Sequence, residues 1–153
     1  MKLMLDTQIY DLIVDTPGMT ERLNELSREG KVVVLSTHIQ EDELAEIPDK
    51  RKRAAVARIV KEKVPTSGAI WDISRWDEGT WGDGSSGGMS IDEVRSPSAG
   101  HGKDALIATT AARDADILVT NDTRLANRVR TLDAPFDVWS FDEFREYVFS
   151  VKW

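Results

Sequence analysis

The hydrophobic residues of this chain form short continuous runs that alternate with segments of helical periodicity. Four runs are predicted to be strands, at residues 2–6, 31–35, 117–120 and 136–140. Uninterrupted apolar runs are typical of parallel strands that are buried on both faces of a sheet. Strands that alternate with helices predict an α/β fold, a three-layer α/β/α domain with a mostly parallel central sheet.

The segments between these runs repeat their apolar residues at helical spacing. Helices are predicted at 7–13, 20–29, 37–47, 49–63, 104–113, 122–131 and from 142 onward. The stretch at about 65–101 is different, because it holds three tryptophans followed by a run of Gly, Ser and Asp. It is predicted to be an irregular insertion rather than part of the sheet. The length of 153 residues suits one domain that spans 1–153 and carries this insertion.

Composition narrows the classes of function. The chain has no cysteine, which excludes disulfides, zinc ribbons and cysteine nucleophiles and suits a reducing cytoplasm. No apolar run has the length of a membrane span, and the residues before Asp6 are too few for a signal peptide core. A net charge of -7 argues against general coating of nucleic acid, although a local basic patch could still bind phosphates. We therefore expect a cytoplasmic protein without a membrane partner.

Four acidic residues are predicted to meet at one edge of the sheet. Asp6 and Asp122 directly follow strands, Glu43 lies on the helix after the second strand, and Asp104 opens the helix before the third. Ligands of parallel sheets bind where the strands end. Four carboxylates in one crevice repel one another unless a cation lies between them, and oxygen ligands favour Mg²⁺ or Mn²⁺. Such ions support phosphodiester hydrolysis by activating water and stabilising the leaving oxygen.

Each of these acids also has a simpler interpretation. An aspartate after a strand is often only a helix cap, so capping and metal ligation both stay open for Asp6 and Asp122. Glu43 has acidic neighbours, and a run of acids is usually a solvated face. Glu41 is the alternative ligand if Glu43 is not one.

Three segments together resemble the PIN-domain ribonucleases, a family that includes toxins of the VapC type. They are MLDTQIYDLI, THIQEDELAEI and KDALIATTAARDADILVTND, and with the short final strand they cover most of the chain outside residues 65–100. The resemblance implies that Asp6, Glu43, Asp104 and Asp122 are the catalytic residues and bind Mg²⁺ or Mn²⁺. Thr7, Thr120 and Asn121 would be supporting polar residues. The implied reaction cleaves RNA and leaves a 5′-phosphate and a 3′-hydroxyl.

The same resemblance implies partners and shows one departure. It implies an RNA substrate, a cognate antitoxin protein and a homodimer. Many relatives carry another acid two residues after the last aspartate, where this chain has Arg124. The occupancy of a second metal position is therefore left open.

Residues 50–63 carry seven basic side chains against the single acid Glu62. They form either a solvated helix face or a surface that binds the RNA backbone. The RNA-backbone candidates are Arg51, Lys52, Arg53, Arg58 and Arg124. Trp71, Trp76 and Trp81 either stack on bases or anchor the insertion.

Two other functions compete with a metal-dependent ribonuclease. The first is a catalytically silent PIN-like module that binds RNA or protein. The second is a phosphotransferase or phosphatase with Asp6 as the nucleophile. Enzymes of that class usually need a second aspartate two residues later, where this chain has Gln8, so this interpretation is disfavoured.

Overall fold

A five-stranded sheet forms the centre of the computed structural model, which describes residues 1–67, 79–80, 85–86, 89–90, 102–131 and 134–152. For residues 66–67, 79–80, 85–86, 89–90, 102–106 and 109 it describes the backbone alone. The strands lie in the order β3-β2-β1-β8-β9, and every neighbouring pair is parallel. Their bounds are β1 Lys2–Leu5, β2 Val33–Ser36, β3 Glu62–Lys63, β8 Ile117–Val119 and β9 Asp137–Trp139. The predicted α/β class and parallel sheet are therefore confirmed.

The register of the sheet brings the ends of its central strands to one edge. Met4 of β1 pairs with Leu35 of β2 on one side and with Leu118 of β8 on the other. The ladder continues past the strand ends, because the Asp6 amide donates to the Val119 carbonyl at 2.9 Å. The Thr120 amide likewise donates to the Trp139 carbonyl at 2.9 Å. The residues that follow β1 and β8 are thus held side by side at the carboxyl edge.

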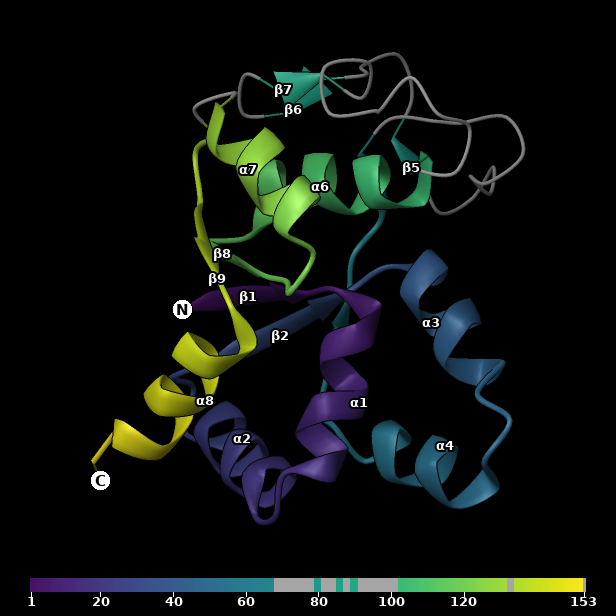
Figure 1. Ribbon diagram of the computed structural model, residues 1–153, viewed down its shortest axis with the longest axis vertical. Helices are drawn as coiled ribbons and strands as arrows, with labels where there is room; N and C mark the ends of the chain where they lie inside the picture. The colour runs from purple at the N-terminus through teal and green to yellow at the C-terminus, as the bar shows by residue number, and fades with distance from the viewer. Residues whose placement is uncertain (68–78, 81–84, 87–88, 91–101, 132–133, 153) are drawn as a thin grey trace.

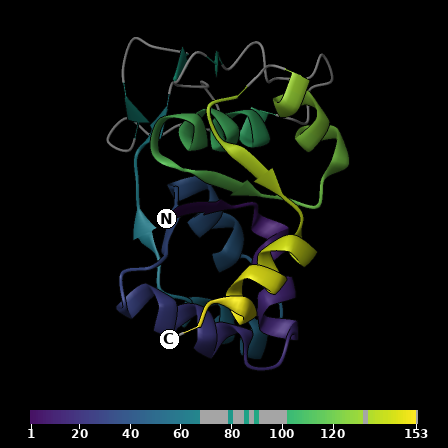
Figure 2. The same cartoon turned by 90° about the vertical axis from the view of Figure 1, so that its left-hand side faces the viewer.

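Helices cover both faces of the sheet (Figure 1). One layer contains α1 Thr7–Asp15, α2 Met19–Arg28, α4 Lys50–Ala57 and α8 Phe141–Ser150, and the other contains α6 Gly102–Asp114 and α7 Thr123–Thr131. Figure 2 shows the same separation, with α6 and α7 in green above the sheet and α8 in yellow below it. The helix α3, His38–Ala45, contributes Ile39 to one core and Leu44 to the other. This arrangement is compatible with three α/β/α layers.

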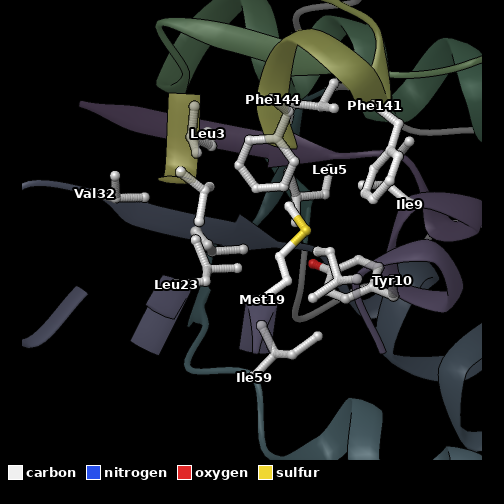
Figure 3. Packing of buried hydrophobic residues seen from close by; sticks show 14 of the residues in the cluster. Leu3, Leu5, Ile9, Tyr10, Met19, Leu23, Val32, Ile59, Phe141 and Phe144 are labelled. Carbon is white, nitrogen blue, oxygen red and sulfur yellow. The ribbon is translucent and has the colours of Figure 1, made fainter. Parts of the chain in front are cut away.

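The larger core lies between β1 and the helices α1, α2 and α8 (Figure 3). Alternation along β1 directs Leu3 and Leu5 into it, while Met4 enters the core on the opposite face. Phe144 of α8 is fully buried there. The strand that leads to Asp6 is therefore fixed by packing from both sides.

Tyr10 of α1 is fully buried in this core, and its hydroxyl has no hydrogen-bond partner among the described residues. Figure 3 shows that hydroxyl directed into the cluster of apolar side chains. Burial, with a further contribution from Glu41, raises the pKa of Tyr10 far above its ordinary range, so the phenol stays neutral.

Replacing Tyr10 with Phe should therefore stabilise the protein, because it removes a buried polar atom that gains nothing in the folded state. We expect the free energy of unfolding to rise by about 1 kcal/mol. Urea unfolding of wild type and Tyr10→Phe measures the difference. A loss of stability would contradict this account and would show that the hydroxyl is hydrogen-bonded.

The predicted helix over 49–63 is wrong in its second half. The helix α4 ends at Ala57, and the chain then joins the sheet as β3. The cause is a distant side chain: Asn24 donates to the Arg58 carbonyl and accepts from the Val60 amide, each at 2.9 Å. These two bonds replace helical hydrogen bonds, so the helix cannot continue.

Within the described residues the insertion lies outside the central sheet, as predicted, but it is not wholly irregular. It contains four strands of two residues each, in two small sheets that are separate from the central one. These are β4 Thr66–Ser67 with β5 Gly79–Thr80, which are parallel, and β6 Ser85–Ser86 with β7 Met89–Ser90, which are antiparallel. Trp71, Trp76 and Trp81 lie outside the described residues. No helix in the described part of the chain has the length and apolar character needed to cross a membrane.

Candidate metal centre

Asp6 follows β1 and caps the start of α1. Its carboxylate is almost buried, with 8% of the residue exposed. One oxygen, Oδ1, accepts a hydrogen bond from the Thr7 amide at 2.8 Å, and the other, Oδ2, accepts one from the Thr120 hydroxyl at 2.9 Å. The strand end and these two bonds fix the position of the carboxylate.

Thr120 links Asp6 to Asp122. Its hydroxyl oxygen donates to Asp6 and accepts from the Asp122 amide at 3.0 Å. Thr120 is itself buried, at 3% exposure. The sequence-based expectation that Asp6 and Asp122 follow strands at one edge is thus met by a specific hydrogen-bonded connection.

Asp122 caps α7 with a single carboxylate oxygen. Its Oδ1 accepts from the amides of Arg124 at 2.9 Å and Leu125 at 3.1 Å. The capping interpretation is therefore correct for Asp122, as it is for Asp6. The cap does not use Oδ2, so it is compatible with a second role as a ligand.

Substitutions at Asp122 separate the cap from the ligand. Asn is as good a cap as Asp, so Asp122→Asn should retain wild-type stability, whereas Asp122→Ala should lose about 1 kcal/mol. If Asp122 also binds a metal ion, both variants should lose metal-dependent cleavage of RNA. Urea unfolding and a cleavage assay with Mn²⁺ measure the two effects. Full cleavage by Asp122→Asn would show that Asp122 is a cap alone.

The backbone places Asp104 in the first turn of α6. This helix packs on the sheet through residues such as Ala108 and Ala111, and it ends at Asp114, just before β8 begins. A helix that returns the chain to the start of a parallel strand begins near the opposite, carboxyl edge. In Figure 1 the start of α6 lies on the same side as the ends of β1 and β2. The side chain of Asp104 lies outside the described residues.

Glu43 and its alternative, Glu41, have different surroundings on α3. Glu43 is half-buried in the last turn of the helix. Glu41 accepts a hydrogen bond from the Ser36 hydroxyl at 2.8 Å and lies 4.0 Å from the Lys61 ammonium. Glu43 remains the predicted ligand of α3, and Glu41 remains its alternative.

The two supporting polar residues beside these acids differ in their surroundings. The hydroxyl oxygen of Thr7 is buried next to Asp6 and has no hydrogen-bond partner among the described residues. Asn121 instead accepts from the Phe141 amide at 2.9 Å, which fixes the start of α8 to the end of β8. Thr7 therefore has a buried hydroxyl without a partner among the described residues, whereas the Asn121 side chain holds the start of α8 to the end of β8.

The described residues contain no group of three or more His, Cys, Asp or Glu that could hold a metal ion. The side chain of Asp104 is not among the described ones. The oxygen groups at this edge are the Asp6 carboxylate, the Thr120 hydroxyl that bonds both this carboxylate and the Asp122 backbone amide, the buried Thr7 hydroxyl, and the Asp122 carboxylate that caps α7. All are hard oxygen donors, so this set fits Mg²⁺ or Mn²⁺ if α6 supplies a third carboxylate.

The five RNA-backbone candidates do not form one surface with one role. Lys52 contacts Asp15 at 3.2 Å and Asp11 at 3.7 Å, and the bond to Asp15 raises the pKa of Lys52. Arg53 donates to the Ile47 carbonyl at 3.3 Å. The other three, Arg51, Arg58 and Arg124, are exposed.

One buried polar residue near the site was missed in the sequence. Gln40 of α3 is fully buried; its Oε1 accepts from the Thr37 amide at 2.7 Å, and its Nε2 donates to the Leu5 carbonyl. It therefore ties the start of α3 to the residue before Asp6. A signal existed, because Thr37 and Gln40 have the spacing of a capping box.

Comparisons of this chain with protein-family models, with curated proteins and with solved structures give no match.

Proposed function

We propose that this protein is a Mg²⁺- or Mn²⁺-dependent endoribonuclease whose ligands are Asp6, Glu43, Asp104 and Asp122. The observation that carries the proposal is the bridge through Thr120, which joins the nearly buried Asp6 carboxylate to the backbone amide of a second aspartate, Asp122, at the carboxyl edge of a parallel sheet. That edge is where ligands of such sheets bind. The resemblance of the surrounding segments to PIN-domain ribonucleases supports the choice of reaction.

The residues of the chain have distinct tasks in this proposal. Asp6 and Asp122 would hold the ion, and the Thr120 hydroxyl positions the Asp6 carboxylate and the backbone of Asp122. When bound, the ion supplies Lewis acidity to the phosphodiester group and lowers the pKa of water. Thr7 would be a supporting residue beside Asp6, where its hydroxyl oxygen is buried. An antitoxin partner and a homodimer remain predictions from the resemblance.

A specific observation favours the alternative, a catalytically silent module that binds RNA or protein. Both aspartates serve as helix caps, and the described side chains do not complete a site with three carboxylates. Capping alone would account for both residues. The two functions differ in whether RNA is cut, so a direct assay separates them.

The test is cleavage of labelled single-stranded RNA by the purified protein with Mn²⁺, with Mg²⁺ and with EDTA. The proposal predicts cleavage with either ion, none with EDTA, and products that carry a 5′-phosphate and a 3′-hydroxyl. Asp122→Asn provides a control for a contaminating nuclease, because it retains the cap but should not cut. RNA binding without cleavage under every condition would favour the silent module.

A further inference from the structure

A pocket of about 770 Å³ opens between α3, α4 and β3. Its volume is in the range of small-molecule and cofactor sites. The pocket lies on the face of the sheet that carries the larger core, and Ser36, at the end of β2, forms part of its wall. None of its basic residues belongs to the carboxylate site.

The lining of the pocket has a net positive charge. Arg53, Lys61 and Lys63 line it, and Glu41 is the acid among the lining residues. The side chain of Lys61 is only 12% exposed, and its ammonium lies 5.3 Å from the centre of the Tyr10 ring. Packing on an aromatic face holds this cation in place, so the charge is part of the folded structure rather than a mobile surface lysine.

The lining also includes apolar side chains. Leu44 of α3, Val56 of α4 and Ile59 line the pocket, and all three belong to the larger core. A ligand that matches both the basic and the apolar residues of this lining needs an anionic group attached to a largely apolar body. A nucleotide has this combination, because its phosphate suits the lysines and its base suits the apolar residues.

We infer that this pocket is an RNA subsite that takes one nucleotide of the substrate strand next to the cleavage site, an inference that depends on the proposed function. Its position supports this assignment. Met4 pairs with Leu35, so β1 and β2 end side by side, with Asp6 after one strand and Ser36 closing the other. Adjacent strands lie about 4.8 Å apart. An RNA strand bound at Asp6 would therefore pass only the end of β2 to reach the pocket.

The pocket replaces the predicted surface along α4 as the main contact with the RNA backbone. Lys52 of α4 contacts Asp11 and Asp15 and does not line the pocket, whereas Lys61, which lies 4.0 Å from Glu41, and Lys63 do line it. Lys61 and Lys63 were predicted to lie on a helix, but the end of α4 at Ala57 and the formation of β3 carry them to the pocket. If the pocket binds the RNA, replacing Lys61 and Lys63 should weaken binding. If the surface along α4 binds it, replacing Lys52 should do so.

The test measures binding of a fluorescein-labelled oligouridylate to the full chain in EDTA, over a range of salt concentrations. The variant is Lys61→Met with Lys63→Met, which retains the aliphatic stems, and the matched control is Lys52→Met. Loss of two phosphate contacts should weaken binding roughly tenfold near physiological salt and lower the salt slope by about 1.4. Lys52→Met should bind as wild type does. Urea unfolding verifies that all three proteins are folded.

Two results would overturn the inference: unchanged binding by the double variant, or an equal loss in Lys52→Met, which would indicate a diffuse basic surface. A third would do so too. In that result, binding of free uridine monophosphate would depend on the two lysines while binding of the oligouridylate would not. The pocket would then be a site for a free nucleotide. These results are independent of the proposed nuclease activity, because EDTA prevents cleavage. Wild type that cleaves RNA with Mn²⁺ but shows no lysine effect would disprove the subsite alone.

Discussion

Asp6→Asn is expected to abolish metal-dependent cleavage of RNA while leaving the protein folded. Loss of a residue that merely supports a metal ligand usually costs 10–100-fold in affinity or activity, so loss of the ligand itself should cost about 100-fold or more. The fold should survive, because an asparagine oxygen can still accept from the Thr7 amide. The asparagine NH₂ group would then donate to the Thr120 hydroxyl, which is the donor to Asp6 in the wild type. Initial rates of RNA cleavage with saturating Mn²⁺ measure the effect.

Asp137→Asn is the matched control, because it makes the same chemical change at the opposite edge of the same sheet. Asp137 is exposed at the start of β9 and pairs with Ile117 at the start of β8. It should retain wild-type cleavage. If the two variants were equally active, Asp6 would be a helix cap and the proposed catalytic site would be wrong.

Phe144→Ala should cause the largest loss of stability among the changes considered. Phe144 is fully buried in the core that holds Leu3 and Leu5 of β1. Truncating a buried phenylalanine removes apolar burial and leaves a cavity, with a typical cost of about 3–5 kcal/mol. Because domains unfold with about 5–15 kcal/mol, this change should remove a large part of the stability. The midpoint and slope of urea unfolding measure it.

Phe149→Ala controls for the substitution itself, since it makes the same change on the same helix. Phe149 is 50% exposed. Surface changes of this kind usually alter stability by less than about 0.5 kcal/mol. Similar losses in Phe144→Ala and Phe149→Ala would mean that α8 does not pack on β1 in the way described.

The sequence predicted the parts of the fold that depend on local hydrophobic pattern. Continuous apolar runs located β1, β2, β8 and β9 within one or two residues. The strand β3 was missed because its two residues, Glu62 and Lys63, are charged and exposed at an edge. The end of α4 was missed because it depends on Asn24, which is distant in sequence. A hydrogen bond between distant residues leaves no periodic signal near the helix it ends.

Part of the candidate site could likewise be predicted from the sequence, and part could not. The parallel-sheet rule placed Asp6 and Asp122 at one edge from their positions after strands, and the bond network through Thr120 joins them. That rule could not predict that Lys61 would pack on Tyr10 and line a pocket, since this depends on where α4 stops. Ligation by Glu43 and Asp104 stays a prediction, and it is the part of the site that most needs a direct test.

The most direct test of the metal centre is calorimetric titration of Mn²⁺ into the wild type and into Asp104→Asn, with Asp137→Asn as the control. Our account predicts that the wild type and Asp137→Asn bind Mn²⁺ and that Asp104→Asn does not, because the first turn of α6 must supply the third carboxylate. Binding that is unchanged in Asp104→Asn, or absent in the wild type, would contradict a metal site formed by Asp6, Asp104 and Asp122.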